Sequence, residues 1–184
     1  MSPDPFTQTS MQAVALLVVV VLPWLLLETW RSRRHERALR AAGAIEPTDD
    51  VYAWMRIVYP GMFVAMTLEG VWGRLAVDPI VPVALIVSGL VVFFAGKLLK
   101  WWAILSLGRL WTFHVLVLPG VPLVASGPYR WLRHPNYVGL MGEIAGVALL
   151  MRAPITGVLS GLAFGALLVA RIRVEERMLR DMAR

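Results

Sequence analysis

The chain has 184 residues, of which 58% are hydrophobic, and it carries a formal net charge of +6. Soluble domains are roughly one half apolar, so this composition and the mean hydropathy of +0.67 predict an integral membrane protein. Because the chain has no cysteine, disulfides, a thiolate nucleophile and cysteine-based metal sites are excluded.

The apolar segments predict an all-α integral membrane protein that forms a single domain over residues 1–184. About five helices of roughly 20 residues each fit this length. We expect spans at residues 11–29, 55–73, 79–99, 137–151 and 153–170. After the first span, Arg33–Pro47 predicts a short helix on the membrane surface, with Gly43 at its C-terminus and Pro47 as a stop. Pro60 is expected to kink the second span.

Residues 100–136 differ from the spans, because tryptophan, glycine and proline interrupt every apolar run. We interpret this segment as an interfacial connector before the fourth span. The fifth span is expected to continue as a cytosolic helix over residues 171–184. The glycines of the last two spans favour close helix packing over a direct contact with a ligand; they are Gly139, Gly142, Gly146, Gly157, Gly161 and Gly165.

The basic residues follow the expected topology. With the N-terminus outside and the C-terminus in the cytoplasm, five crossings place every lysine and arginine except Arg74 and Arg152 on the cytosolic side. Lys97 and Lys100 mark the cytosolic end of the third span. Cytosolic flanks of membrane proteins are enriched in such residues, so the net charge requires no nucleic-acid partner.

Polar and aromatic side chains gather in two cytosolic segments. In GPYRWLRHPNY, residues 127–137, Gly127 and Pro128 predict a turn, and Pro135 biases His134 away from helical geometry, so that its imidazole can face a ligand. Beyond the last span, Arg171 and Glu175 share one helix face at i and i+4. Spacing alone favours a surface ion pair for these two residues over a functional site.

The motif Arg133-His134-Pro135, then a helical hairpin, then Glu175-Glu176, resembles the signature of the isoprenylcysteine carboxyl methyltransferase family. LLLETWRSRRHERALRAAGAIEP and LGRLWTFHVLVLPGVPLVASGPYR are similar to the N-terminal part and the connector of its bacterial members. The resemblance covers nearly the whole chain. It implies an O-methyltransferase of the bacterial inner membrane that uses S-adenosylmethionine, bound at the cytosolic face between the connector and the C-terminal helix.

The resemblance also implies the site residues. Arg171 would face the methyl acceptor, and no metal is expected. Where eukaryotic members have a glutamine, this chain has Val117, which leaves the acceptor open between a prenylcysteine-like carboxylate and a long-chain polyketide lipid. The bacterial likeness favours the polyketide lipid. The residues expected around the cofactor are Leu123, Val124, Tyr129, Arg133, His134, Pro135, Tyr137, Glu175 and Glu176.

These residue types suit methyl transfer. The cofactor needs an acid for its ammonium or hydroxyl groups and aromatic or apolar walls, and the transfer needs the acceptor oxygen held in line. A carboxylate acceptor needs no base, and Arg171 would position it. A phenol or enol acceptor needs a base, which His114 or His134 could supply. An interfacial structural position is an equal alternative for His114.

Other functions explain the sequence less completely. A sterol-reductase-like protein would need a nicotinamide cofactor and more spans. A membrane scaffold or small transporter subunit would account for Glu69 and Glu143 inside apolar segments, where ionisable groups are costly, but not for the cytosolic motif. A structural hydrogen bond explains Glu69 equally well. The expected partners are a lipophilic acceptor from the bilayer and membrane lipids, and the oligomeric state is open.

Overall fold

The computed structural model describes residue 15 and residues 17–76 and 82–182. In this part of the chain no β-strand occurs, and an isolated β-bridge joins Ile45 to Val117. The expected all-α fold is therefore confirmed. A π-helical turn, Leu17–Val21, leads directly into an α-helix. The α-helices are α2 (Leu22–Ala41), α3 (Tyr52–Ala76), α4 (Val83–Leu107), α5 (Pro135–Met151) and α6 (Pro154–Met182).

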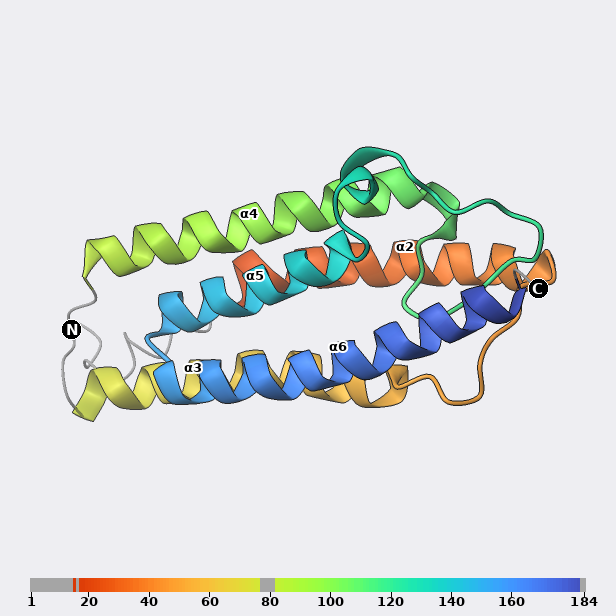
Figure 1. The fold of residues 1–184 in the computed structure, drawn as a ribbon. Coiled ribbons are helices and arrows are strands. Elements are labelled where there is room, and N and C mark those ends of the chain that lie inside the picture. Colours follow the sequence, from red (N-terminus) through yellow and green to blue (C-terminus); the bar gives the residue numbers. More distant parts are fainter. Residues whose placement is uncertain (1–14, 16, 77–81, 183–184) are drawn as a thin grey trace.

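The helices lie lengthwise beside one another, with α5 between α4 and α6 (Figure 1). α3 packs against both α5 and α6. The segment between α4 and α5, the end of α2 and the end of α6 gather at one end of the bundle, on the right of Figure 1. The segments that carry the polar motifs are therefore neighbours in space.

Two helices are longer than the sequence predicts. The prediction of a separate surface helix at Arg33–Pro47 is wrong, because α2 continues without a break from Leu22 to Ala41 through good helix formers. Gly43 does end this helix as expected: its φ is +87°, and its N–H donates to the Arg40 carbonyl at 3.1 Å. α4 likewise runs past residue 99 to Leu107. α2 is thus one continuous helix, in which a basic C-terminal half follows an apolar N-terminal half.

Two segments of the described structure are long and apolar enough to cross a membrane. They are Val83–Leu110, which contains α4, and Pro154–Asp181, which contains most of α6. α5 is also apolar but shorter. These helices support a membrane protein, whereas five crossings and their orientation stay predictions.

Glycines allow the backbones of α4 and α5 to approach closely. A Cβ atom on Gly146 would lie 2.5 Å from the Phe93 nitrogen, and one on Gly96 would lie 2.7 Å from the Gly139 carbonyl oxygen. Gly165 on α6 has no such neighbour within 4 Å in the described structure. The predicted packing function is therefore confirmed for α5 and is not seen at Gly165.

We expect Gly146→Ala to lower the free energy of unfolding by about 1–3 kcal/mol, because the added methyl group must push α5 away from Phe93. Gly165→Ala is the matched control. It adds the same methyl group to a helix interior without a close neighbour, so helix propensity should leave stability unchanged or raise it by up to about 1 kcal/mol. Thermal unfolding in detergent measures both variants, and equal melting temperatures would contradict the packing argument.

Candidate functional site at the start of α5 and the end of α6

The turn before α5 is fixed by Gly127, whose φ is +58°. A Cβ atom there would collide with the Ser106 hydroxyl and would strain the backbone at this φ, which favours glycine. A 3-10 turn, Gly127–Arg130, follows, and His134 then precedes α5 with φ −129° and ψ 60°. The predicted turn and the non-helical backbone of His134 are both confirmed. Pro135, buried at the first position of α5, sets this geometry.

Arg171 joins α6 to the start of α5. Its side chain is only 5% exposed, and its Nε donates to the Tyr137 hydroxyl at 2.9 Å and to Glu175 Oε1 at 3.3 Å. The Tyr137 hydroxyl in turn donates to the same carboxylate oxygen. Arg171, Tyr137 and Glu175 therefore form a closed hydrogen-bonded triangle rather than the simple surface ion pair that spacing favoured.

The guanidinium of Arg171 also holds two loops. Nη1 donates to Asp50 Oδ1 at 3.1 Å, and Nη2 donates to the carbonyl of Phe113. Asp50 Oδ2 accepts the N–H of Val115 at 3.0 Å. Each of the three nitrogens of Arg171 is thus engaged within the protein, and one side chain ties α6 to the segment before α3 and to the connector.

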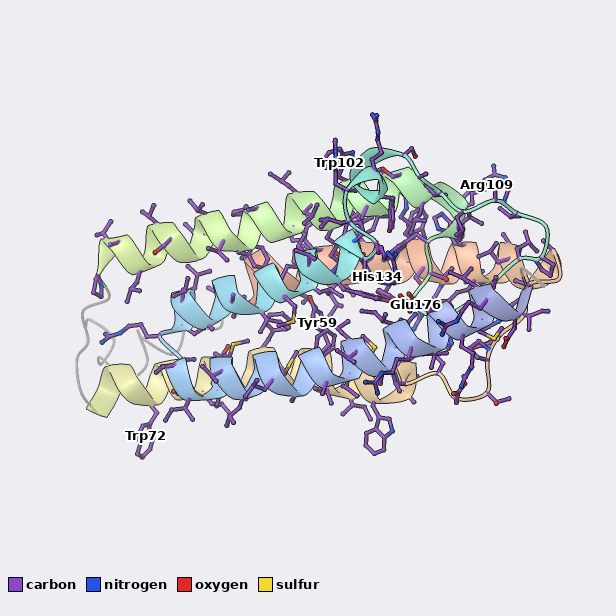
Figure 2. The ribbon with its side chains drawn as sticks, viewed as in Figure 1. Tyr59, Trp72, Trp102, Arg109, His134 and Glu176 are labelled. Carbon is purple, nitrogen blue, oxygen red and sulfur yellow. The ribbon has the colours of Figure 1, made fainter. Side chains whose placement is uncertain are left out.

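His134 faces the paired glutamates. Its Nδ1 lies 3.6 Å from Glu175 Oε2, and its Nε2 lies 3.7 Å from Glu176 Oε1. The His134 ring is stacked on Tyr137, with centroids 5.5 Å apart and planes 7° apart. Figure 2 shows His134 and Glu176 close together between the start of α5 and α6. The two halves of the motif, far apart in sequence, therefore meet in space.

The remaining residues predicted to bind the cofactor differ in how far they are buried and in whether they lie near Glu175. Burial, and then the negative charge of Glu175, raise the pKa of the Tyr129 hydroxyl well above its ordinary value, so it stays a neutral donor. Val124 is half-buried, whereas Arg133 is exposed and Leu123 is 72% exposed. The structure thus leaves Leu123 and Arg133 on the surface. It brings together what we call the α5–α6 cluster, namely Tyr129, His134, Tyr137, Glu175 and Glu176.

His114 lies at a neighbouring position. Its Nδ1 is 2.6 Å from Glu46 Oε1, and its ring centre is 4.2 Å from that of Tyr52. All three residues, together with Asp50, line a hollow of about 240 Å³. Burial raises the pKa of Glu46, but hydrogen bonds from Arg40 and His114 outweigh it and lower that pKa overall. The hollow adjoins Arg171 through Asp50.

Four buried charges form an ion cluster that the sequence did not predict. Lys97 Nζ lies 2.7 Å from Glu143 Oε2 and 3.2 Å from Glu28 Oε1, and Lys100 Nζ lies 2.6 Å from Glu28 Oε2. Lys100 also lies 3.3 Å from Glu143 Oε1. The Tyr59 hydroxyl, from α3, donates to Glu143 at 2.8 Å. The sequence placed both lysines at the end of a span without showing that their side chains are buried.

One sequence signal pointed towards this cluster. Lys97 and Lys100 are three residues apart and so share one face of α4, and Glu143 interrupts an apolar helix. Ionised groups buried in apolar surroundings need partners of opposite charge. The pairing of the two lysines with Glu143 could therefore be predicted from the sequence. The contribution of Glu28 could not, because it depends on how α2 packs against α4.

Glu69 has a structural function. Its two carboxylate oxygens accept the backbone N–H groups of Ile155 at 3.1 Å and Thr156 at 2.7 Å. These groups belong to the first turn of α6, where backbone N–H groups have no partner within the helix. Glu69 on α3 therefore caps α6, and the structural account of this residue is confirmed.

Comparison with known proteins decides the family. A model of the isoprenylcysteine carboxyl methyltransferase (ICMT) family matches residues 86–181, which contain the α5–α6 cluster. The chain belongs to the ICMT family. Membership in the ICMT family implies membrane methyltransferase activity.

Two bacterial proteins are similar in sequence to most of this chain. The Bacillus subtilis protein YpbQ, whose name marks it as uncharacterized, is 30% identical over 90% of this chain and 96% of its own length. An uncharacterized protein of Haemophilus influenzae is 27% identical over 79% of this chain and 82% of its own length. No solved structure matches. The sequence likeness to these two proteins therefore extends beyond the residues that the family model matches.

Proposed function

We propose that this protein transfers the methyl group of S-adenosylmethionine to an oxygen atom of a lipophilic acceptor that enters from the bilayer. The observation that carries the proposal is the meeting of His134 with Glu175 and Glu176, at 3.6 and 3.7 Å. Family membership supports the methyltransferase activity. The apolar helices α4 and α6 beside the cluster support an acceptor that is itself apolar.

The residues of the α5–α6 cluster fit the cofactor. Glu175 and Glu176 keep 24% and 38% of their side chains exposed, so their carboxylates can accept hydrogen bonds from an ammonium group or from ribose hydroxyls. Asn136, which lies between Pro135 and Tyr137 in the chain, has a buried Oδ1 with no hydrogen-bond partner among the described residues. The stacked His134 and Tyr137 rings offer an aromatic wall. The bound cofactor supplies an electrophilic methyl group.

The acceptor is best matched by a phenol or enol. Arg171 has each nitrogen engaged by protein atoms, so we assign it the positioning of Tyr137, Glu175 and the loop that ends at His114, instead of the binding of an acceptor carboxylate. His114 pairs through Nδ1 with Glu46, which leaves Nε2 free to take a proton from a hydroxyl group. A long-chain polyketide hydroxyl suits this arrangement better than a prenylcysteine-like carboxylate, which needs no base.

Binding of S-adenosylmethionine tests the proposal. We expect calorimetry of the protein in detergent to detect binding, and Glu175→Ala to weaken it by roughly 10- to 100-fold, the effect of losing a hydrogen bond to a charged group. Asp181→Ala is the matched control, because Asp181 is an exposed carboxylate on the same helix. Absence of binding by the unaltered protein would sink the methyltransferase proposal. If Glu175→Ala bound S-adenosylmethionine as tightly as Asp181→Ala, Glu175 would not be part of the cofactor site.

A further inference from the structure

The outer face of α2 is apolar near Leu26 and becomes basic towards Arg37. Its residues at i, i+3, i+4, i+7, i+8 and i+11 lie on one side of the helix. The opposite side carries buried residues, among them Glu28 and Ser32. The outer residues line a hollow of about 480 Å³, and in chain order they are Leu26, Thr29, Trp30, Arg33, Arg34 and Arg37.

This order follows the profile of a membrane leaflet. Leu26 and Trp30 are each 60% exposed, and the arginines follow within about 16 Å of Leu26 along the axis at 1.5 Å per residue. A leucine suits the acyl region, a tryptophan suits the interface, and arginines suit the phosphate level. The face therefore presents an apolar and a cationic part to one molecule at the same time.

The three arginines of this face are not neutralised by the protein. Arg33, Arg34 and Arg37 have no carboxylate within ion-pair distance in the part of the chain that the structure describes. The guanidinium of Arg34 instead lies over the ring of Trp30, 5.9 Å from its centre. Guanidinium groups present several donors in a planar fork that matches a phosphate group. Three of them around one hollow form a receptor for an anion.

We infer that this face of α2 binds the headgroup of an anionic phospholipid, with the phosphate among Arg33, Arg34 and Arg37 and the upper acyl chain against Leu26 and Trp30. A free phosphate ion would use only the cationic part of the hollow. A lipid uses both parts, which is why the lipid is the occupant that fits. The inference does not depend on methyl transfer, because the hollow lies on α2, away from the α5–α6 cluster.

Native mass spectrometry of the full chain, delipidated in detergent and titrated with phosphatidylglycerol or phosphatidylcholine, tests this site. We expect the triple variant Arg33→Gln, Arg34→Gln, Arg37→Gln to bind phosphatidylglycerol roughly tenfold or more weakly than the unaltered protein, given the contribution of each basic residue near an anionic leaflet. Binding of phosphatidylcholine should not change.

The matched control is Arg109→Gln, Arg130→Gln, Arg180→Gln, which removes the same charge from exposed positions on other elements. We expect less than about a twofold change for this control. Equal losses in both triple variants would overturn the inference in favour of general electrostatic attraction. Displacement of the lipid by millimolar inorganic phosphate would overturn it in favour of a simple anion site. Trp30→Ala keeps every charge, so it should weaken the binding of phosphatidylglycerol but not the binding of inorganic phosphate. An unchanged affinity for phosphatidylglycerol would also contradict the proposed occupant.

Discussion

Lys100→Met will lower the free energy of unfolding by about 3–5 kcal/mol, the range observed when one partner of a buried ion pair is removed. Lys100 is 2% exposed and contacts both glutamates of the ion cluster, at 2.6 and 3.3 Å. Methionine preserves much of the shape of the side chain but leaves two buried carboxylates facing the single ammonium of Lys97. Thermal or denaturant unfolding in detergent measures the loss.

A charge-balanced variant separates this effect from lost packing. Lys100→Met combined with Glu28→Gln leaves the pair Lys97 and Glu143, which still lie 2.7 Å apart. We expect this double variant to be clearly more stable than Lys100→Met alone, because the two residues interact directly and their effects are not additive. Arg40→Met, which breaks the exposed pair with Glu46, should cost less than about 1 kcal/mol. A double variant as unstable as the single one would show that shape, and not charge balance, stabilises the cluster.

The ion cluster also bears on what this protein does. Glu69 and Glu143 inside apolar helices would suit the alternative of a transporter, because such groups often mark an ion pathway. Here Glu143 is engaged by Tyr59 and two lysines, and Glu69 caps α6. Both glutamates therefore have structural partners. The cluster joins α2, α3, α4 and α5 through side-chain contacts.

The parts of the site that the sequence predicted depend on local backbone rules. Glycine permits the positive φ found at Gly127, and Pro135 disfavours helical geometry at His134, so the turn before α5 could be placed from neighbouring residues alone. The approach of Glu175 to His134 followed from the hairpin between them. These features involve few alternatives, because chain connectivity or a single residue type decides each one.

The parts that were missed depend on packing between distant segments. Lys97 and Lys100 stand where an apolar run becomes polar, a position typical of a membrane flank, and only the packing of Glu28 on α2 against α4 shows that they are buried. The partners of Arg171 were missed for the same reason. Asp50 and Phe113 reach it from two loops that have no regular pattern in the sequence.

Arg171→Ala should reduce kcat/KM by about 100-fold, with a much smaller change in the affinity for S-adenosylmethionine. Arg171 contacts Tyr137, Glu175, Asp50 and the carbonyl of Phe113, so its removal frees two loops and two side chains beside the proposed site. A displacement of about 1 Å between reacting groups can cost this factor. Transfer of radiolabel from the cofactor to a bacterial lipid extract measures turnover, and calorimetry measures affinity.

Two further variants separate positioning from charge. Arg171→Lys keeps the positive charge, but a single ammonium cannot hold the partners of three guanidinium nitrogens, so we expect it to recover little of the lost turnover. Arg173→Ala removes an exposed arginine from the same helix and should leave turnover within about twofold of the unaltered protein, as exposed charges contribute little. If lysine restored full turnover, charge alone would suffice. If cofactor affinity fell as much as turnover in Arg171→Ala, the main function of the arginine would be to position Tyr137 and Glu175 for the cofactor, and not to hold the loop that precedes His114.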